Sequence, residues 1–154
     1  MNYRATGITL NPFKPYFNLS NEELKKRGMR RYVADDDGYP CRVSLVNAPL
    51  GENILLVNFD HQPAHSPYKS GGPIFVRETD MEPAEFINEL PEVAKGRMLS
   101  VRAYDDEDLI CDADITIGDE LEGLIERFFG DEQVSYLHVH NAKRGCYAFR
   151  VDRV

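Results

Sequence analysis

Alternation of apolar and polar residues runs through most of the chain and predicts a protein built mainly from strands. Residues 97–104 and 109–117 alternate on either side of an acidic turn, which predicts a hairpin. Residues 134–151 predict a second hairpin that reverses at 141–145. An unbroken run rich in Ile, Leu and Val at 53–59 predicts a strand buried on both faces at the centre of the sheet.

Four shorter segments predict the remaining strands: 3–10 at a sheet edge, 29–34, 41–46 and 74–79. Within 41–46 the alternation places Cys41 on the core face and Arg42 on the opposite face. Cys111 falls on the apolar face of its own strand in the same way, so we expect it in the core.

Helix patterns are fewer. Ser20 and Glu23 form a capping box before a short helix. Residues 120–129 carry one apolar stripe at helical spacing, with Asp119 as the expected N-cap, and 83–88 predict a single helical turn. The combined pattern predicts an α+β fold, a mostly antiparallel sheet with helices packed on one face.

Composition narrows the class of protein. A chain of 154 residues with 42% hydrophobic residues is expected to form a single globular domain spanning 1–154. Its net charge of −8 argues against a nucleic-acid or anionic-membrane surface, and no apolar run is long enough to span a membrane. Three cysteines without a CxxC pair and an N-terminus without signal-peptide character favour a reducing, cytoplasmic setting.

Histidines give the strongest indication of chemistry. His138 and His140 are two residues apart on a predicted strand, so both imidazoles point to one face, as metal ligands or as acid–base groups. The proline- and glycine-rich stretch 60–73, predicted to be a long loop, carries His61 and His65 and could supply a third ligand. Three imidazoles on a divalent transition metal would leave a position for water, which makes a hydrolase conceivable.

Two other kinds of chemistry fit the same region. Cys146 lies across the turn from the histidine strand, and a Cys–His pair can generate a catalytic thiolate. Arg42, Arg77 and Arg144 lie in or beside these segments and suit a small anionic ligand, with Tyr68 as a further ligand-binding candidate in the loop. The leading hypothesis is a small-molecule binding or catalytic pocket built from 60–73 and 134–151.

Simpler interpretations stay open at this point. The two histidines of the terminal hairpin could hydrogen-bond across the sheet, and the arginines could pair with the many acidic residues. In a different class, the chain would be a non-enzymatic interaction protein that pairs its edge strands with a partner or with a second copy to form a homodimer.

Two long stretches resemble a known family. They are 40–78 and 136–153, which contain in order the pieces PCR, HQP, SPY, GGPIFVR and HVHN-x-x-RGC. These stretches resemble the bacterial family known as domain of unknown function 1203. The resemblance implies one domain in a bacterial, cytoplasmic protein, and it implies no catalytic residues.

Overall fold

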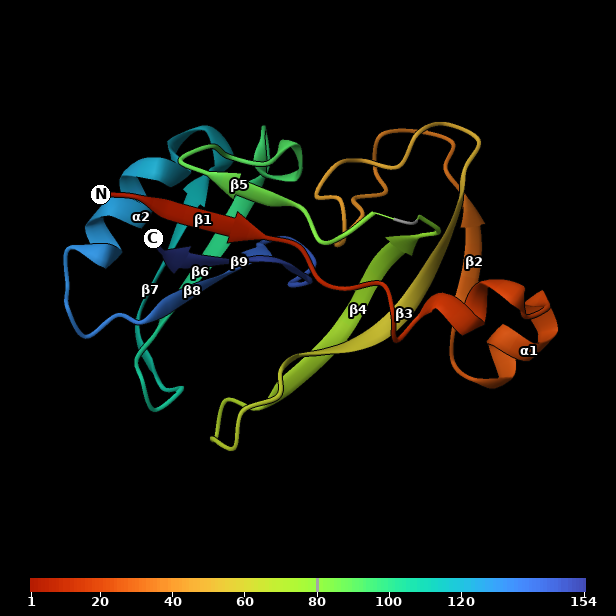
Figure 1. Cartoon of the computed structure of the whole chain (residues 1–154), viewed down its shortest axis with the longest axis horizontal. Coiled ribbons are helices and arrows are strands. Elements are labelled where there is room, and N and C mark those ends of the chain that lie inside the picture. The colour runs from red at the N-terminus through yellow and green to blue at the C-terminus, as the bar shows by residue number, and fades with distance from the viewer. Residues whose placement is uncertain (80) are drawn as a thin grey trace.

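The computed structural model describes residues 1–79 and 81–154 and contains two antiparallel sheets (Figure 1). The larger sheet has the strand order β5-β1-β9-β8-β6-β7 and the smaller has the order β2-β3-β4. The larger sheet consists of β1 (Tyr3–Thr6), β5 (Glu85–Ile87), β6 (Met98–Tyr104), β7 (Ile110–Ile117), β8 (Tyr136–Asn141) and β9 (Tyr147–Arg153). The smaller consists of β2 (Arg30–Val33), β3 (Asn53–Gln62) and β4 (Ser70–Arg77).

Helices are short. The α-helices are α1 (Asn21–Lys26) and α2 (Leu121–Phe129), and the 3-10 turns are η1 (Lys14–Asn18), η2 (Glu92–Ala94) and η3 (Gly118–Glu120). Among the described residues, no helix is long and apolar enough to cross a membrane.

The predicted α+β fold is wrong, because the protein is mostly β. Strands make up about 39% of the chain and helices about 17%. Among the described helices, α2 has the longest apolar stripe, and it packs against one face of the larger sheet. The opposite face carries polar and aromatic side chains, and the end of the β3–β4 hairpin packs against part of it. A second sheet therefore takes the place that we expected helices to fill.

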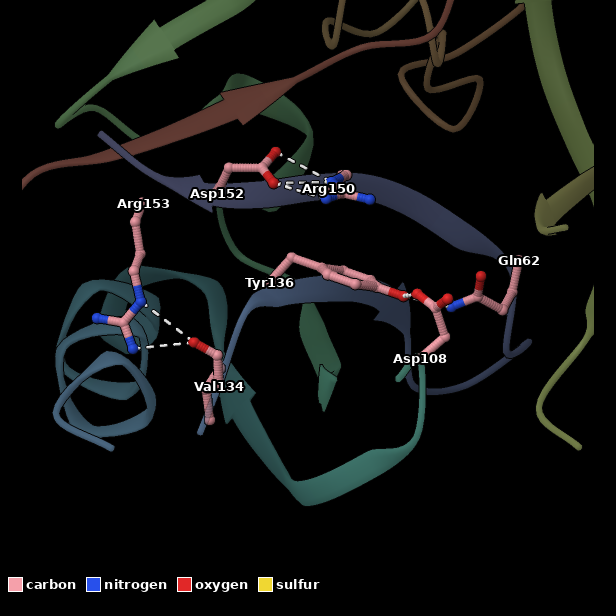
Figure 2. Close-up of polar contacts among 7 residues, drawn as sticks. All are labelled: Gln62, Asp108, Val134, Tyr136, Arg150, Asp152 and Arg153. Carbon is pink, nitrogen blue, oxygen red and sulfur yellow. Dashed lines mark hydrogen bonds and ion pairs between the residues drawn. The ribbon is translucent and has the colours of Figure 1, made fainter. Parts of the chain in front are cut away.

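The core of the larger sheet follows the predicted alternation. Its inward side chains are Leu99, Val101 and Ala103 from β6, Leu137 and Val139 from β8, and Phe149 and Val151 from β9. They meet the predicted stripe of α2: Leu121, Leu124, Ile125 and Phe128. Arg153 donates hydrogen bonds to the carbonyls of Phe129, Asp131 and Val134 just beyond the helix, two of which Figure 2 shows at Val134. Both predicted hairpins and the helix are confirmed.

A separate apolar cluster packs the smaller sheet against α1 and the preceding segment. Leu10, Phe13 and Leu24 cover Leu55 and Val57 of β3. The capping box is confirmed, because the Ser20 side chain accepts from the Glu23 N–H and the Glu23 carboxylate accepts from the Ser20 N–H. Figure 1 shows this unit beside the larger sheet, so each sheet has an apolar core of its own, and Ala34, Ala48 and Ile54 form a further small cluster.

The segment 41–46 is not the predicted strand. It is a buried turn in which Leu45 adopts a positive φ of 56°. Its apolar residues alternate because they enter different cores: Cys41 and Val43 join the core of the smaller sheet, and Leu45 joins that of the larger. Cys41 is fully buried, as predicted.

The structure overturns four other expectations. The strand at 3–10 is not an edge strand, because β1 pairs with both β5 and β9. The predicted helical turn at 83–88 is instead β5. Asp119 makes no cap and lies inside η3. Cys111 is exposed on β7, which is an edge strand of the larger sheet.

Half of the predicted loop 60–73 is strand. β3 runs to Gln62 and β4 begins at Ser70, so the connection is limited to 63–69. A register shift between Phe59 and Gln62 marks a bulge in this hairpin. The bulge matters for function because bulges redirect side chains, and His61 lies inside it.

Candidate metal centre

Three of the four histidines converge between the two sheets. His61 comes from the end of β3, and His138 and His140 come from β8. One ring nitrogen from each lies within 4.8 Å of the others. The ring centroids of His61 and His140 are 4.8 Å apart, and the other two pairs are 6.3 and 6.5 Å apart. We call these three residues the histidine cluster.

Strand geometry explains how the cluster forms. His138 and His140 share a face because side chains alternate along β8, while Leu137 and Val139 enter the core. His61 reaches them from a strand of the other sheet, at the bulge that follows Phe59.

Each histidine has a buried ring nitrogen with no hydrogen-bond partner among the described residues. These atoms are Nδ1 of His61, Nδ1 of His138 and Nε2 of His140. His140 donates from Nδ1 to the Gly145 carbonyl at 2.9 Å, which leaves its Nε2 with a lone pair. An unmet buried polar atom costs about 1–3 kcal/mol, so three in one cluster make it a candidate ligand-binding site.

Burial keeps these imidazoles neutral. It lowers the pKa of His138 to about 3, with further contributions from the neighbouring His140 and from Arg150. Burial lowers the pKa of His140 to about 4, although the hydrogen bond to Gly145 opposes the shift. The pKa of His61 is also lowered, chiefly by burial. Neutral imidazole is the form that binds metals.

Aromatic rings surround the cluster. The Tyr147 ring stacks on His61 with centroids 5.4 Å apart and an interplanar angle of 3°. Tyr104 and Tyr136 pack against His138, with centroids 5.0 and 5.2 Å from it. Such walls hold imidazoles in fixed orientations and exclude water, as a metal centre requires.

Sequence reasoning did not find Tyr147. Strict alternation along 146–151 places Tyr147 on the core face with Phe149 and Val151. A register shift opposite His140 adds one residue to β9, so that Tyr147 and Arg150 both face the polar side. Nothing in the sequence indicates a one-residue bulge here.

A hydrogen-bonded chain ties β3 to the larger sheet beside the cluster (Figure 2). Gln62, the neighbour of His61, donates from Nε2 to the Tyr136 hydroxyl at 2.9 Å. That hydroxyl donates to Asp108 Oδ1 at 2.5 Å. Arg150 lies 3.9 Å over the Tyr136 ring and pairs with Asp152 at 2.7 Å. This series of hydrogen bonds fixes the end of β3, and therefore the backbone that carries His61.

A cation stands next to the cluster. Arg102 on β6 is the cross-strand partner of His138 and forms no ion pair with any described residue. Cross-strand partners share a face, so Arg102 adds positive charge on the side where the histidines lie. Its alternation with Val101 and Ala103 is the sequence signal that places it on this face.

Three other predicted site residues lie elsewhere. Arg42, Arg144 and Cys146 line a separate pocket on the far side of the 141–146 turn. Cys146 is not part of the histidine cluster, so the structure does not bring the predicted Cys–His pair together there.

The remaining predicted residues are peripheral. Arg77 pairs with Glu52 at 3.1 Å at the opposite end of the β3–β4 hairpin. Tyr68 is exposed in the 63–69 connection, with its ring 6.2 Å from that of Tyr104 at the margin of the site. His65 is exposed and outside the cluster.

These features define a mostly-β protein in which two antiparallel sheets bring together two buried histidines, His138 and His140, and the half-buried His61. The chain belongs to the family described as protein of unknown function (DUF1203), whose model matches residues 38–153. That range contains the whole histidine cluster and confirms the resemblance noted from the sequence. No curated protein and no solved structure is significantly similar to the chain.

Proposed function

We propose that this protein binds one divalent transition metal ion through His61, His138 and His140 and uses it to bind and activate a small anionic molecule. The observation that carries the proposal is the convergence of three histidines that each offer a ring nitrogen within 4.8 Å of the others. Each of them also has a buried ring nitrogen without a hydrogen-bond partner among the described residues.

The donor set fits such an ion. Zinc–imidazole bonds of about 2.0–2.1 Å place tetrahedral ligand nitrogens about 3.3 Å apart, so small side-chain rotations would close the cluster. The Gly145 carbonyl that accepts from His140 Nδ1 is the kind of partner that orients metal-binding imidazoles. Three neutral imidazoles suit zinc, copper, nickel and ferrous iron.

The arrangement supports Lewis-acid chemistry. A bound ion with three protein ligands keeps a position for water or substrate and polarises what binds there. Arg102, which has no carboxylate partner among the described residues, would hold the negative charge of the substrate. His138 and His140 act here as ligands rather than as proton donors, because their lowered pKa values leave them unprotonated at neutral pH.

Cobalt binding tests the proposal. Protein without a histidine tag, stripped with a chelator, should bind Co²⁺ at one ion per chain with a visible absorption band that Zn²⁺ abolishes. His138→Ala should weaken binding by about 100-fold or more, because a ligand is removed outright. His65→Ala removes an exposed histidine and is the matched control, with unchanged affinity expected. Substoichiometric binding, or equal loss in both variants, would contradict the proposal.

The interaction-protein alternative has less support. The β7 edge does expose Ile115 and Ile117. Asp112 and Asp114, however, accept hydrogen bonds at 2.8 Å from the backbone N–H groups of the residues that follow them. Carboxylates on an edge strand that occupy its N–H groups oppose pairing with another strand.

A further inference from the structure

A second pocket, of about 860 Å³, lies between the two sheets at the 141–146 turn. We infer that it binds a small organic anion that carries an aromatic ring. We call it the cationic pocket. Its volume falls in the range that accommodates metabolite-sized ligands.

Charge is the first argument. The pocket is lined by four cations and one carboxylate: Arg42, Arg97, Lys143, Arg144 and Asp36. None of the four cations forms an ion pair with a residue in 1–79 or 81–154. Such an excess is notable in a chain with net charge −8, where carboxylates are plentiful. An anion that enters this pocket therefore meets four cations against one lining carboxylate, Asp36.

Arg42 is the strongest single observation. Its side chain is buried, with 4% exposure, yet only neutral carbonyls bind it. Nε donates to the Tyr147 carbonyl at 2.8 Å and Nη1 to the Pro40 carbonyl at 2.6 Å, while Nη2 makes no hydrogen bond with a described residue. Burial lowers its pKa to about 10, and the nearby Arg97 adds to the shift. A buried guanidinium without a counter-ion is unfavourable, and a bound anion would relieve it.

Arg97 is held in place in a similar way. It donates to the Val93 carbonyl at 3.0 Å and to Asn47 Oδ1 at 2.8 Å. Both acceptors are neutral, so they orient the guanidinium without cancelling its charge. Two preorganised arginines thus face one pocket, flanked by the exposed cations Lys143 and Arg144.

Aromatic residues of the pocket indicate that the uncharged part of the ligand is a ring. Tyr32, Tyr39 and Phe75 line the side that the smaller sheet provides. The Phe75 centroid lies 5.3 Å from that of Tyr39 and 6.1 Å from that of Tyr32. Arg97, Lys143 and Arg144 come from the side of the larger sheet, so one molecule that spans the pocket would meet rings on one side and charge on the other.

The cationic pocket and the histidine cluster are distinct. None of the three histidines lines the pocket. Tyr147 contacts both the cationic pocket and the histidine cluster. Its carbonyl accepts a hydrogen bond from Arg42, and its ring stacks on His61. The inference therefore does not depend on the metal centre.

Calorimetric titration with phenyl phosphate, benzoate and methyl phosphate tests the inference on the protein as purified. Phenyl phosphate or benzoate should bind at one site, and methyl phosphate more weakly than phenyl phosphate because it lacks the ring. Whichever of phenyl phosphate and benzoate binds more tightly identifies phosphate or carboxylate as the anionic group of the ligand. Arg42→Gln should weaken binding by about 10- to 100-fold, as expected for a lost charged hydrogen bond.

A second pair of variants covers the case in which Arg42→Gln fails to fold. Lys143→Gln with Arg144→Gln removes two exposed charges and should weaken binding by about 3- to 10-fold. Lys25→Gln with Lys26→Gln makes the same charge change on α1, away from the pocket, and should leave binding unchanged. Binding should also persist in His138→Ala, which separates this site from the metal centre. No binding by either aromatic probe, or equal weakening in both charge pairs, would overturn the inference.

Discussion

The histidine cluster and the cationic pocket both contact Tyr147, and burial lowers the pKa of their buried groups, but the charge that results differs. Imidazole can lose its proton, so burial makes His138 and His140 neutral. Guanidinium keeps its proton, so Arg42 stays charged at neutral pH although it is equally buried. The comparison shows that equal burial produces electron-pair donors where the side chain is imidazole and positive charge where it is guanidinium.

The largest difference between the two regions should appear in the pH dependence of stability. His138 and His140 have folded-state pKa values of about 3 and 4, below the unfolded value of about 6.5. As pH falls below 6.5, the unfolded chain takes up protons that the folded protein does not. The metal-free protein should therefore lose up to about 1.4 kcal/mol per pH unit for each histidine, until the folded-state pKa values are reached.

Urea titrations of metal-free protein between pH 7 and pH 4.5 measure this slope. His138→Gln should reduce it by up to about half, since one of the two most strongly shifted histidines is removed. Arg42→Gln should leave the slope unchanged, because guanidinium does not titrate there. A slope that is insensitive to His138→Gln would mean that His138 is not buried in neutral form.

The next largest difference between the two sites should appear in thermal stabilisation by ligands. Zinc at about 100 times its Kd should stabilise the protein by about 2.7 kcal/mol, a rise in Tm of roughly 5–10 °C. His140→Ala should abolish this rise. Phenyl phosphate at about 10 times its Kd should add roughly 1.4 kcal/mol and should do so equally in His140→Ala. Loss of both shifts in that variant would show that the two regions are one site.

Gly145 allows a test of the link between the turn and the cluster. Gly145 and Gly51 both adopt positive φ, of 80° and 86°, and added Cβ atoms would meet nothing within 4 Å in either place. Gly145→Ala and Gly51→Ala should therefore each cost about 1 kcal/mol of stability through backbone strain alone.

Only Gly145→Ala should also weaken Co²⁺ binding, by about 10-fold, because the Gly145 carbonyl orients His140. Gly51→Ala is the matched control for strain. Equal cobalt affinity in the two variants would show that this carbonyl has no orienting role.

The smallest effect is expected from Tyr136→Phe. It removes the hydroxyl that joins Gln62 to Asp108 and should cost about 1 kcal/mol. Looser anchoring of β3 should weaken Co²⁺ binding by about 2- to 3-fold. Tyr39→Phe removes a comparable bond, 3.0 Å from Asp35, in the cationic pocket and should leave Co²⁺ binding unchanged. A metal affinity that falls equally in both would contradict the anchoring role.

The sequence predicted the local structure correctly wherever a single periodicity, that of one strand or one helix, determined it. Both hairpins, the stripe of α2 and the shared face of His138 and His140 follow from spacing along a single strand or helix. Prediction from the sequence failed where one segment contributes side chains to two different cores. Residues 41–46 alternate like a strand, yet they fold as a turn because Val43 and Leu45 enter different cores.

Two single-residue failures have the same cause. Cys111 has the pattern of a core residue, but the pattern does not reveal that its strand lies at an edge of the larger sheet. Tyr147 changes face because of one bulge, and a bulge depends on how the partner strand is held. The α+β expectation failed similarly, because strand patterns do not say whether a helix or another sheet covers them.

By itself, the sequence determined the local periods, the caps and the pairing of two imidazoles on one strand face, since these depend on residues close together in the chain. Only the tertiary structure decided that His61 completes the cluster and that Arg42 and Arg144 face a different pocket. Both outcomes depend on how the two sheets pack and on two bulges, which arise from contacts between residues far apart in the chain.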